Sequence, residues 1–337
     1  MSMKKRVYRL INSFSWGSAA LRLRRAARED RGRKLVASAG HHFIDRSKGC
    51  EKLCIVLAGY KQPLWDDVFN RLAAYLPNDV DVCIMTSGLE NEELKSIADR
   101  NGWSYLSTDV NHLSLVQNLA IDHHPNAKWI YKIDEDMFIT KGFFEKLLDT
   151  YLQLENNSLY VPAFVSPLVN VSCYGHLRLL QKTGLLEAFR ETGMTDVKYS
   201  DGLHHNRQVI ENPMVAEFMW GGSNEQLRDI DKLTFEFSEG HDLEYSICPV
   251  RFSIGAILFS RDSWLEFGKF PITFVGSEYG LGDDEEHICH YACFTGRVMA
   301  VNENVVVGHL GYGGAQTKHM MEYYSNHRAQ FSLKDNY

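Results

Sequence analysis

Short apolar runs alternate with amphipathic stretches through the first half of the chain, from residue 53 to residue 134. The apolar runs have the length of buried strands, and the amphipathic stretches repeat apolar residues at helical spacing. We expect strands at 53–58, 80–85, 103–106 and 129–134, and helices at 65–76, 92–101 and 113–123. Strands that alternate with helices in this way predict an α/β domain with a parallel, doubly wound central sheet.

The last of these strands runs directly into three consecutive acids, Asp134, Glu135 and Asp136. Because side chains alternate sides along a strand, we expect Asp134 and Asp136 to point the same way and Glu135 to point elsewhere. Two carboxylates at the carboxyl end of a central strand suit Mg²⁺ or Mn²⁺ and, through the metal, a diphosphate. The alternative is a solvated turn, because an isolated Asp-x-Asp pattern is short and common.

The second half of the chain is less regular. A strand is expected at 159–165, and residues 172–248 are interpreted as a largely irregular insertion, which either binds an acceptor or serves as a lid. Gly255 lies in a further strand, at a place where the backbone must pass close to another group. A glycine-rich loop then brings four acids, beginning with Asp283 and Asp284, to the start of a helix, where the alternative role is interaction with the helix dipole. The last strand ends at His309, and the alternative there is a structural histidine.

Residues 1–48 are expected to form a basic amphipathic leader. The first 50 residues hold 13 Lys and Arg against 3 Asp and Glu, whereas the rest of the chain holds 23 against 40. Basic residues beside Phe14 and Trp16 favour contact of residues 1–34 with an anionic membrane surface. The alternative is a solvated arm or a helix packed on the domain. Residues 49–315 would then form the main domain, and residues 316–337 a C-terminal tail.

Composition narrows the class of protein. An acidic body with a basic leader does not suit a nucleic-acid binder, no apolar run is long enough to span a membrane, and the start of the chain lacks the features of a secretory signal. The seven cysteines have no paired spacing, which favours a reducing, cytoplasmic location.

His287, Cys289, His290 and Cys293 fit helix packing better than a zinc site. The P-loop and dinucleotide-binding signatures are absent.

Taken in order, these motifs resemble those of the GT-A class of nucleotide-sugar-dependent glycosyltransferases, most like glycosyltransferase family 2 and related inverting families. The resemblance covers residues 53–312. It rests on the opening strand, the segment 115–121 before the acid strand, the Asp134–Asp136 motif, the Gly255 strand, the loop that ends in Asp283 and Asp284, and His309.

The resemblance implies a GT-A fold, with a mostly parallel central sheet flanked by helices. It implies transfer of a sugar from a nucleotide-diphosphate sugar, with a UDP-sugar favoured, to the hydroxyl of a glycan or glycolipid. Asp136, Asp134 and His309 match positions that bind Mn²⁺ or Mg²⁺ on the diphosphate. Asp284 matches the catalytic base of inverting enzymes, and Asp283 would orient the acceptor, although the two could exchange roles.

The resemblance also implies a nucleotide-binding side, for which we expect Ala58, Tyr60, Thr86 and Gln117 in addition to Asp134. Thr86 stands where many family members carry an Asp, and Gln117 stands where an Arg is often found, so the nucleotide itself is not defined. A processive-synthase signal is absent, which favours transfer of a single sugar.

Three alternatives stay open at this point. One is a retaining GT-A transferase, and a second is a nucleotidyltransferase or sugar-nucleotide pyrophosphorylase, although the turn at 59–63 matches its basic, glycine-rich loop poorly. The third is a non-catalytic glycan-binding protein of the same fold. If the chain is a transferase, we expect it to be peripheral on the inner face of the cell membrane.

Overall fold

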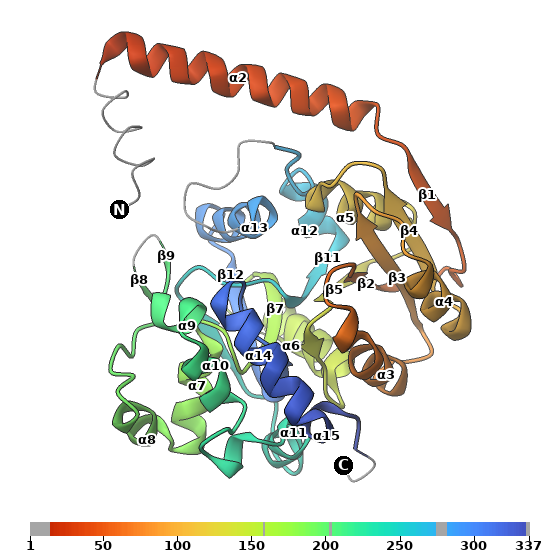
Figure 1. Cartoon of the computed structure of the whole chain (residues 1–337). Helices are drawn as coiled ribbons and strands as arrows, with labels where there is room; N and C mark the ends of the chain where they lie inside the picture. The colour runs from red at the N-terminus through yellow and green to blue at the C-terminus, as the bar shows by residue number, and fades with distance from the viewer. Residues whose placement is uncertain (1–13, 158, 202–203, 274–281, 335–337) are drawn as a thin grey trace.

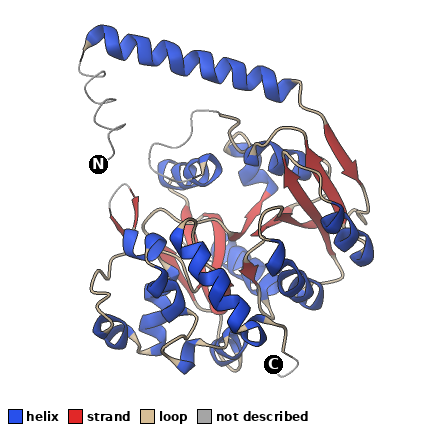
Figure 2. Ribbon diagram, viewed as in Figure 1, coloured by secondary structure: helices blue, strands red, loops and turns tan. Residues whose placement is uncertain are grey.

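A ten-stranded mixed sheet forms the centre of the computed structural model, which describes residues 14–157, 159–201, 204–273 and 282–334 (Figure 1). Its strands lie in the order β1-β4-β3-β2-β5-β11-β7-β12-β10, with β6 beside β12. The strands are β1 (His41–Ile44), β2 (Lys52–Leu57), β3 (Val80–Ser87), β4 (Ser104–Thr108), β5 (Trp129–Asp134), β6 (Met137–Phe138), β7 (Pro162–Val169), β10 (Tyr245–Cys248), β11 (Ala256–Ser260) and β12 (Val298–His309). Helices lie on both faces of this sheet (Figure 2).

The four strands expected in the first half are present and parallel, in the order β4-β3-β2-β5. The expectation of a mostly parallel sheet is wrong beyond β5. There β11 pairs antiparallel with both β5 and β7, and β12 returns parallel to β7. The chain enters β11 from a long insertion rather than from a short crossover helix, so the right-handed βαβ connection that produces parallel neighbours does not apply.

Both faces of the sheet are buried, as the nearly continuous apolar strands require. Leu53 and Ile55 of β2 face one core cluster, whereas Cys54 and Val56 face the other. One face is covered by α3 (Trp65–Tyr75), α4 (Glu92–Asn101) and α6 (Phe143–Asn157). The other is covered by helices that include α5 (Leu113–Asp122), α12 (Arg261–Glu266) and α13 (Asp283–Phe294).

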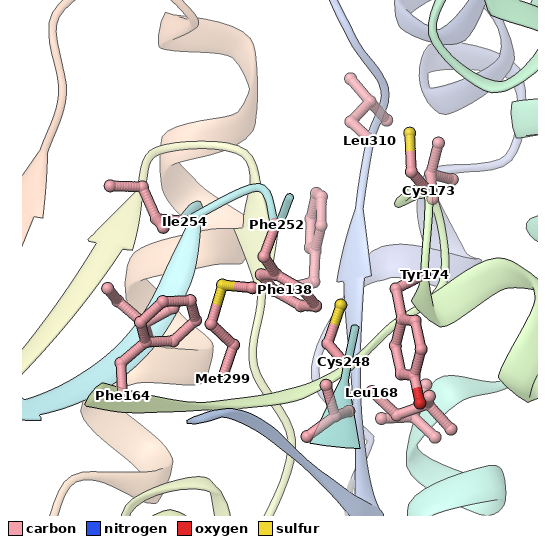
Figure 3. Packing of buried hydrophobic residues seen from close by; sticks show 14 of the residues in the cluster. Phe138, Phe164, Leu168, Cys173, Tyr174, Cys248, Phe252, Ile254, Met299 and Leu310 are labelled. Carbon is pink, nitrogen blue, oxygen red and sulfur yellow. The ribbon is translucent and has the colours of Figure 1, made fainter. Parts of the chain in front are cut away.

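The insertion, residues 172–248, is more regular than expected. It contains α7 (Gly175–Thr183), α8 (Leu186–Glu191), α9 (Arg207–Glu211), α10 (Pro213–Met219), α11 (Ile230–Ser238) and the short strands β8 (Ser200–Asp201) and β9 (His204–His205), and it ends in β10. β10 pairs antiparallel with β12 and so extends the central sheet. Cys173, Tyr174 and Cys248 of this region belong to the same buried cluster as Phe252 and Met299 (Figure 3), so the insertion shares the core of the domain.

The leader predicted at residues 1–48 includes residues that belong to the sheet. β1 pairs antiparallel with β4, from His41 opposite Thr108 to Ile44 opposite Tyr105. The Lys48 and Cys50 backbone N–H groups donate to the carboxylate of Asp81. Residues 41–48 therefore belong to the sheet domain.

The described part of the leader before β1 is the helix α2 (Ser15–Ala37), which lies apart from the rest of the ribbon in Figure 1. Trp16 and Leu23 are exposed at its surface. Among the described residues, no helix combines the length and the apolar character needed to cross a bilayer.

The predicted C-terminal tail is part of the folded core. Residues 315–331 form α14 (Ala315–Asn326) and α15 (Arg328–Phe331), and Phe331 is fully buried. Arg71 of α3, itself fully buried, donates from Nε to the Phe331 carbonyl (2.8 Å) and forms an ion pair with Asp231 (2.7 Å). A guanidinium so far from water needs these partners, so the C-terminal segment completes the core.

Candidate functional site

A cavity of about 320 Å³ opens at the carboxyl ends of β2, β5 and β12. It is lined by groups of both charges: Leu57, Lys61, Asp134, Glu135, Asp136, Met137, Ser253, Glu285, His309, Gly311, Tyr312 and Gly313. Polar groups that converge on one concave site at this edge of an α/β sheet define the candidate functional site.

Backbone pairing fixes the acid motif on three strands. The Asp134 N–H donates to the Gly255 carbonyl (2.8 Å), and the Glu135 N–H donates to the Leu57 carbonyl (3.0 Å). Met137 then pairs with His309 of β12. A Cβ on Gly255 would lie 1.9 Å from the Met137 side chain, which explains why a glycine stands here, as the close approach expected from the sequence requires.

Glu135 lines the same cavity and also holds the loop that follows β2. Its carboxylate accepts from the Gly59 N–H (2.9 Å), the Tyr60 N–H (3.0 Å) and the Trp65 indole N–H (2.6 Å). These three donors occupy a buried carboxylate, which is 6% exposed, and they fix the backbone on both sides of Lys61.

Asp136 is buried and carries two basic partners on one oxygen. Lys61 Nζ forms an ion pair with Asp136 Oδ2, and His309 Nε2 lies 3.3 Å from the same atom. Burial opposes ionisation of this carboxyl, but His309 and Lys61 outweigh it and hold the pKa of Asp136 well below its usual range.

His309 is oriented by residues next to and within the insertion. Its N–H donates to Asn170 Oδ1 (2.8 Å), and its carbonyl accepts from the Trp220 indole N–H (2.8 Å). The imidazole Nδ1 lies 2.8 Å from the Val171 carbonyl and must donate to it, because a carbonyl only accepts. The bond at Nδ1 holds the ring with Nε2 turned towards Asp136, which is the usual orientation of a metal-binding histidine.

Asp134 has a lysine of its own. Lys132 Nζ lies 2.7 Å from Asp134 Oδ1 and 3.0 Å from the Ile254 carbonyl, and Lys132 is 2% exposed. Burial raises the pKa of Asp134, Lys132 opposes this, and the neighbouring carboxylates of Asp136 and Asp284 raise it further. Asp284 therefore lies in the same electrostatic environment as the acid motif.

The acids at the start of α13 face in different directions. Asp284 is 3% exposed and accepts from Gln117 Nε2 (2.9 Å), and its other oxygen lies against Gly282. Glu285 lines the cavity, whereas Asp283 and Asp284 do not. Burial raises the pKa of Asp283, with the His112 imidazole opposing the shift. The cavity therefore brings Asp136 and His309 together, while Asp284 is buried outside its lining.

The expected nucleotide-binding side is smaller than the sequence suggested. Thr86 and Ala58 are buried, and the Thr86 hydroxyl donates to the Leu89 carbonyl (2.7 Å). Gln117 is also buried and bound to Asp284, so none of these three side chains reaches the cavity. Tyr60 is 65% exposed and its hydroxyl donates to the Ser87 carbonyl, so its ring is accessible from solvent although it does not line the cavity.

Three residues in the site were missed by the sequence analysis: Lys61, Lys132 and Glu285. Lys132 stands two positions before Asp134, so strand alternation places both side chains on one face, and that signal was available. Lys61 approaches Asp136 from 75 positions away, and no local pattern reveals such a contact.

The protein side chains supply only part of the ligands that a divalent cation needs at this site. Across the described ranges of the chain, no three His, Cys, Asp or Glu side chains gather closely enough to hold a metal ion. Asp136 and His309 form a pair of an oxygen and a nitrogen donor. Mg²⁺ and Mn²⁺ sites of this kind take their other ligands from phosphate oxygens and water, and the imidazole favours Mn²⁺.

The alternative zinc cluster on α13 does not form. His287 Nε2 lies 2.7 Å from the Phe267 carbonyl, Cys289 contacts the Phe252 carbonyl, and Cys293 is exposed. These contacts are those of helix packing, as the sequence indicated.

Comparisons with known proteins leave the family undefined. No family model matches the chain, and no curated protein matches it. Among solved structures, the chain is similar to the mannosyltransferase PcManGT from Pyrobaculum calidifontis in complex with GDP-Man and Mn²⁺, with a TM-score of 0.44 and 12% identity over 89% of this chain and 68% of that one. At this degree of likeness, function has to be inferred from the geometry of the site.

Proposed function

We propose that this chain is a metal-dependent glycosyltransferase that moves a sugar from a nucleoside-diphosphate sugar to the hydroxyl of a glycan or glycolipid. One observation carries the proposal. Asp136 Oδ2 and His309 Nε2 lie 3.3 Å apart at the edge of a cavity, with the histidine tautomer fixed by the Val171 carbonyl. Two such donors, held in advance, suit a cation that is shared with a diphosphate.

When bound there, a Mn²⁺ or Mg²⁺ ion would neutralise negative charge on the departing nucleoside diphosphate. Asp136 and His309 would hold the ion, and Asp134 stands beside them on the cavity wall. The donor nucleotide would lie towards Tyr60, whose exposed ring offers a face for a base. We take UDP-sugars as the first donors to test and GDP-sugars as the second.

The acceptor side would lie at the start of α13. In an inverting reaction the acceptor oxygen forms a bond to the anomeric carbon while the bond from that carbon to the diphosphate breaks, and a carboxylate takes the hydroxyl proton. Asp284 is the base that the resemblance implies, with Asp283 orienting the acceptor, and Glu285 is the acid that lines the cavity. To reach a substrate, Asp284 would have to break its hydrogen bond with Gln117. Hydrogen bonds of catalytic groups often rearrange in the substrate complex.

Contact with a membrane is a further part of the proposal. α2 carries seven Lys and Arg against two Asp and Glu, and Trp16 and Leu23 are exposed on it. Such a helix is attracted to anionic lipid headgroups. Sedimentation with vesicles that contain an anionic phospholipid tests this: the full chain should co-sediment, and a variant that lacks residues 1–37 should not. Equal co-sedimentation of the two would exclude the helix as the membrane contact.

Release of nucleoside diphosphate from UDP-, GDP-, CDP- and dTDP-sugars, measured with Mn²⁺ and again with EDTA, tests the enzymatic proposal. Turnover of at least one donor with Mn²⁺ and its loss with EDTA are expected. A glycan-binding protein would turn over none of them. The anomeric configuration of the product, read by NMR, separates an inverting from a retaining enzyme.

A further inference from the structure

Lys61 is a cation that the fold itself places on the candidate metal ligand. Its ammonium pairs with Asp136 Oδ2, the same oxygen that faces His309 Nε2. The Lys61 side chain is 28% exposed and lines the cavity, whereas the Asp136 side chain is 4% exposed. The ion pair thus has one fixed, buried member and one member with access to the cavity.

The backbone around Lys61 is fixed, so its freedom lies in the side chain. Glu135 binds the N–H groups of Gly59 and Tyr60 on one side, and the 3₁₀ turn η1 (Gln62–Leu64) begins on the other. Lysine carries its charge on a flexible stem of four carbons. The ammonium can therefore move within the cavity while the loop stays in place.

One carboxylate oxygen does not serve an ammonium and a divalent cation together at low cost. The two positive charges would lie a few ångströms apart in a site shielded from water, where charges repel more strongly than in bulk solvent. A cation that takes Asp136 and His309 as ligands must displace Lys61. The displaced ammonium stays in the cavity, where a diphosphate offers it new acceptors.

We propose that Lys61 is an exchangeable cation: it and the divalent cation compete for Asp136, and the displaced Lys61 binds the diphosphate of the donor. This rests on the proposed function, because it assumes a divalent cation and a nucleoside diphosphate in this cavity. It makes cation and donor binding mutually reinforcing, since each ligand favours the same position of Lys61. Lys132 does not act in this way, because it is buried and also held by the Ile254 carbonyl.

The test uses the full chain, with Mn²⁺ alone followed by EPR and with UDP and GDP followed by calorimetry in saturating Mn²⁺. In Lys61→Met, Mn²⁺ alone should bind about 5-fold or more tightly, because its competitor is gone. The better-bound nucleotide should lose about 10-fold or more in affinity, because one charge-assisted hydrogen bond is lost. Lys61→Arg keeps the charge and should retain most of the nucleotide affinity.

Lys128→Met is the matched control, because it removes a lysine charge from a surface pair with Glu51 and should leave both affinities unchanged. If the wild type binds Mn²⁺ and nucleotide and Lys61→Met binds both equally well, the exchange is refuted and the proposed function stands. Weaker binding of Mn²⁺ alone in Lys61→Met also refutes the competition. If the wild type binds neither ligand, the proposed function fails and this inference fails with it.

Discussion

Asp134 and Asp136 are each paired with a lysine, and the two pairs differ in what surrounds the lysine. Lys132 is 2% exposed and is held by both Asp134 and the Ile254 carbonyl. Lys61 is held by Asp136 and faces the cavity. In the first pair the lysine charge has no access to water, although the Asp134 side chain is 33% exposed. In the second pair the lysine charge is one that a ligand can reach. We therefore propose that the same residue types serve structure at one acid and ligand binding at the next.

The largest effect is expected at the ligand-facing acid. Asp136→Asn should reduce turnover of the nucleotide sugar about a thousandfold or more, because it removes a charged ligand of the cation at the reacting phosphate. Asp134→Asn should keep about ten times more activity than Asp136→Asn, because Asp134 is already engaged by Lys132. Steady-state release of nucleoside diphosphate measures both.

Asp149→Asn, at an exposed position of α6, is the matched control and should be fully active. Equal losses in Asp134→Asn and Asp136→Asn would contradict the difference between the two pairs.

The next effect concerns the acids of α13. Asp284→Asn should lose transfer about a hundredfold while it keeps nucleotide affinity, because the proposed base is removed and the donor side is untouched. Glu285→Gln should stay within about tenfold of the wild type. Rates of transfer and calorimetric binding of the nucleotide give the two quantities. The reverse order of losses would assign the base to Glu285.

The free energy of unfolding should depend more on Lys132 than on Lys61, whereas ligand binding should depend more on Lys61. Lys132→Met leaves Asp134 without its partner and should lower the free energy of unfolding by about 2 kcal/mol or more. Lys61→Met should change it by less than about 1 kcal/mol, because this lysine is partly solvated and the buried Asp136 keeps His309 Nε2 as a partner. Urea unfolding measures both variants, and equal destabilisation would show that both pairs are structural.

The stability that Lys132 contributes should also depend on pH, and this is the smallest of the expected effects. Burial lowers the pKa of Lys132, but Asp134 and Asp284 outweigh it and the pKa is raised overall. A raised lysine pKa gives stability that is fully present below the unfolded value of about 10.4 and is lost as the pH rises through the folded value. The difference in unfolding free energy between wild type and Lys132→Met should therefore be constant from pH 6 to about pH 9 and shrink above about pH 10.4. A difference that falls already below about pH 9 would contradict the raised pKa.

The parallel half of the sheet and the acid motif could be predicted from the sequence because their signals are local. Strand periodicity located β2, β3, β4 and β5, and the acid motif directly after β5 lies at the cavity. The antiparallel insertion of β11 left no such signal, because strand direction depends on how a long connection returns to the sheet.

The C-terminal helices were missed for a related reason. The Phe331 ring is buried against Phe138 and Trp220, and its carbonyl accepts from Arg71, 260 positions away. A short amphipathic segment alone does not reveal such partners. Signals in the insertion were available and not used. Asn206 and Asn212 cap α9 and α10, and Pro213 follows at the first position of α10, which is typical of helix starts.

Anomalous diffraction from a crystal grown with Mn²⁺ and UDP tests the central claim most directly, because it locates the cation. We predict an anomalous peak bound to Asp136 Oδ2 and His309 Nε2, with Lys61 moved from Asp136 to a phosphate oxygen. A peak elsewhere in the chain, with the ion pair between Lys61 and Asp136 intact, would contradict the proposed site.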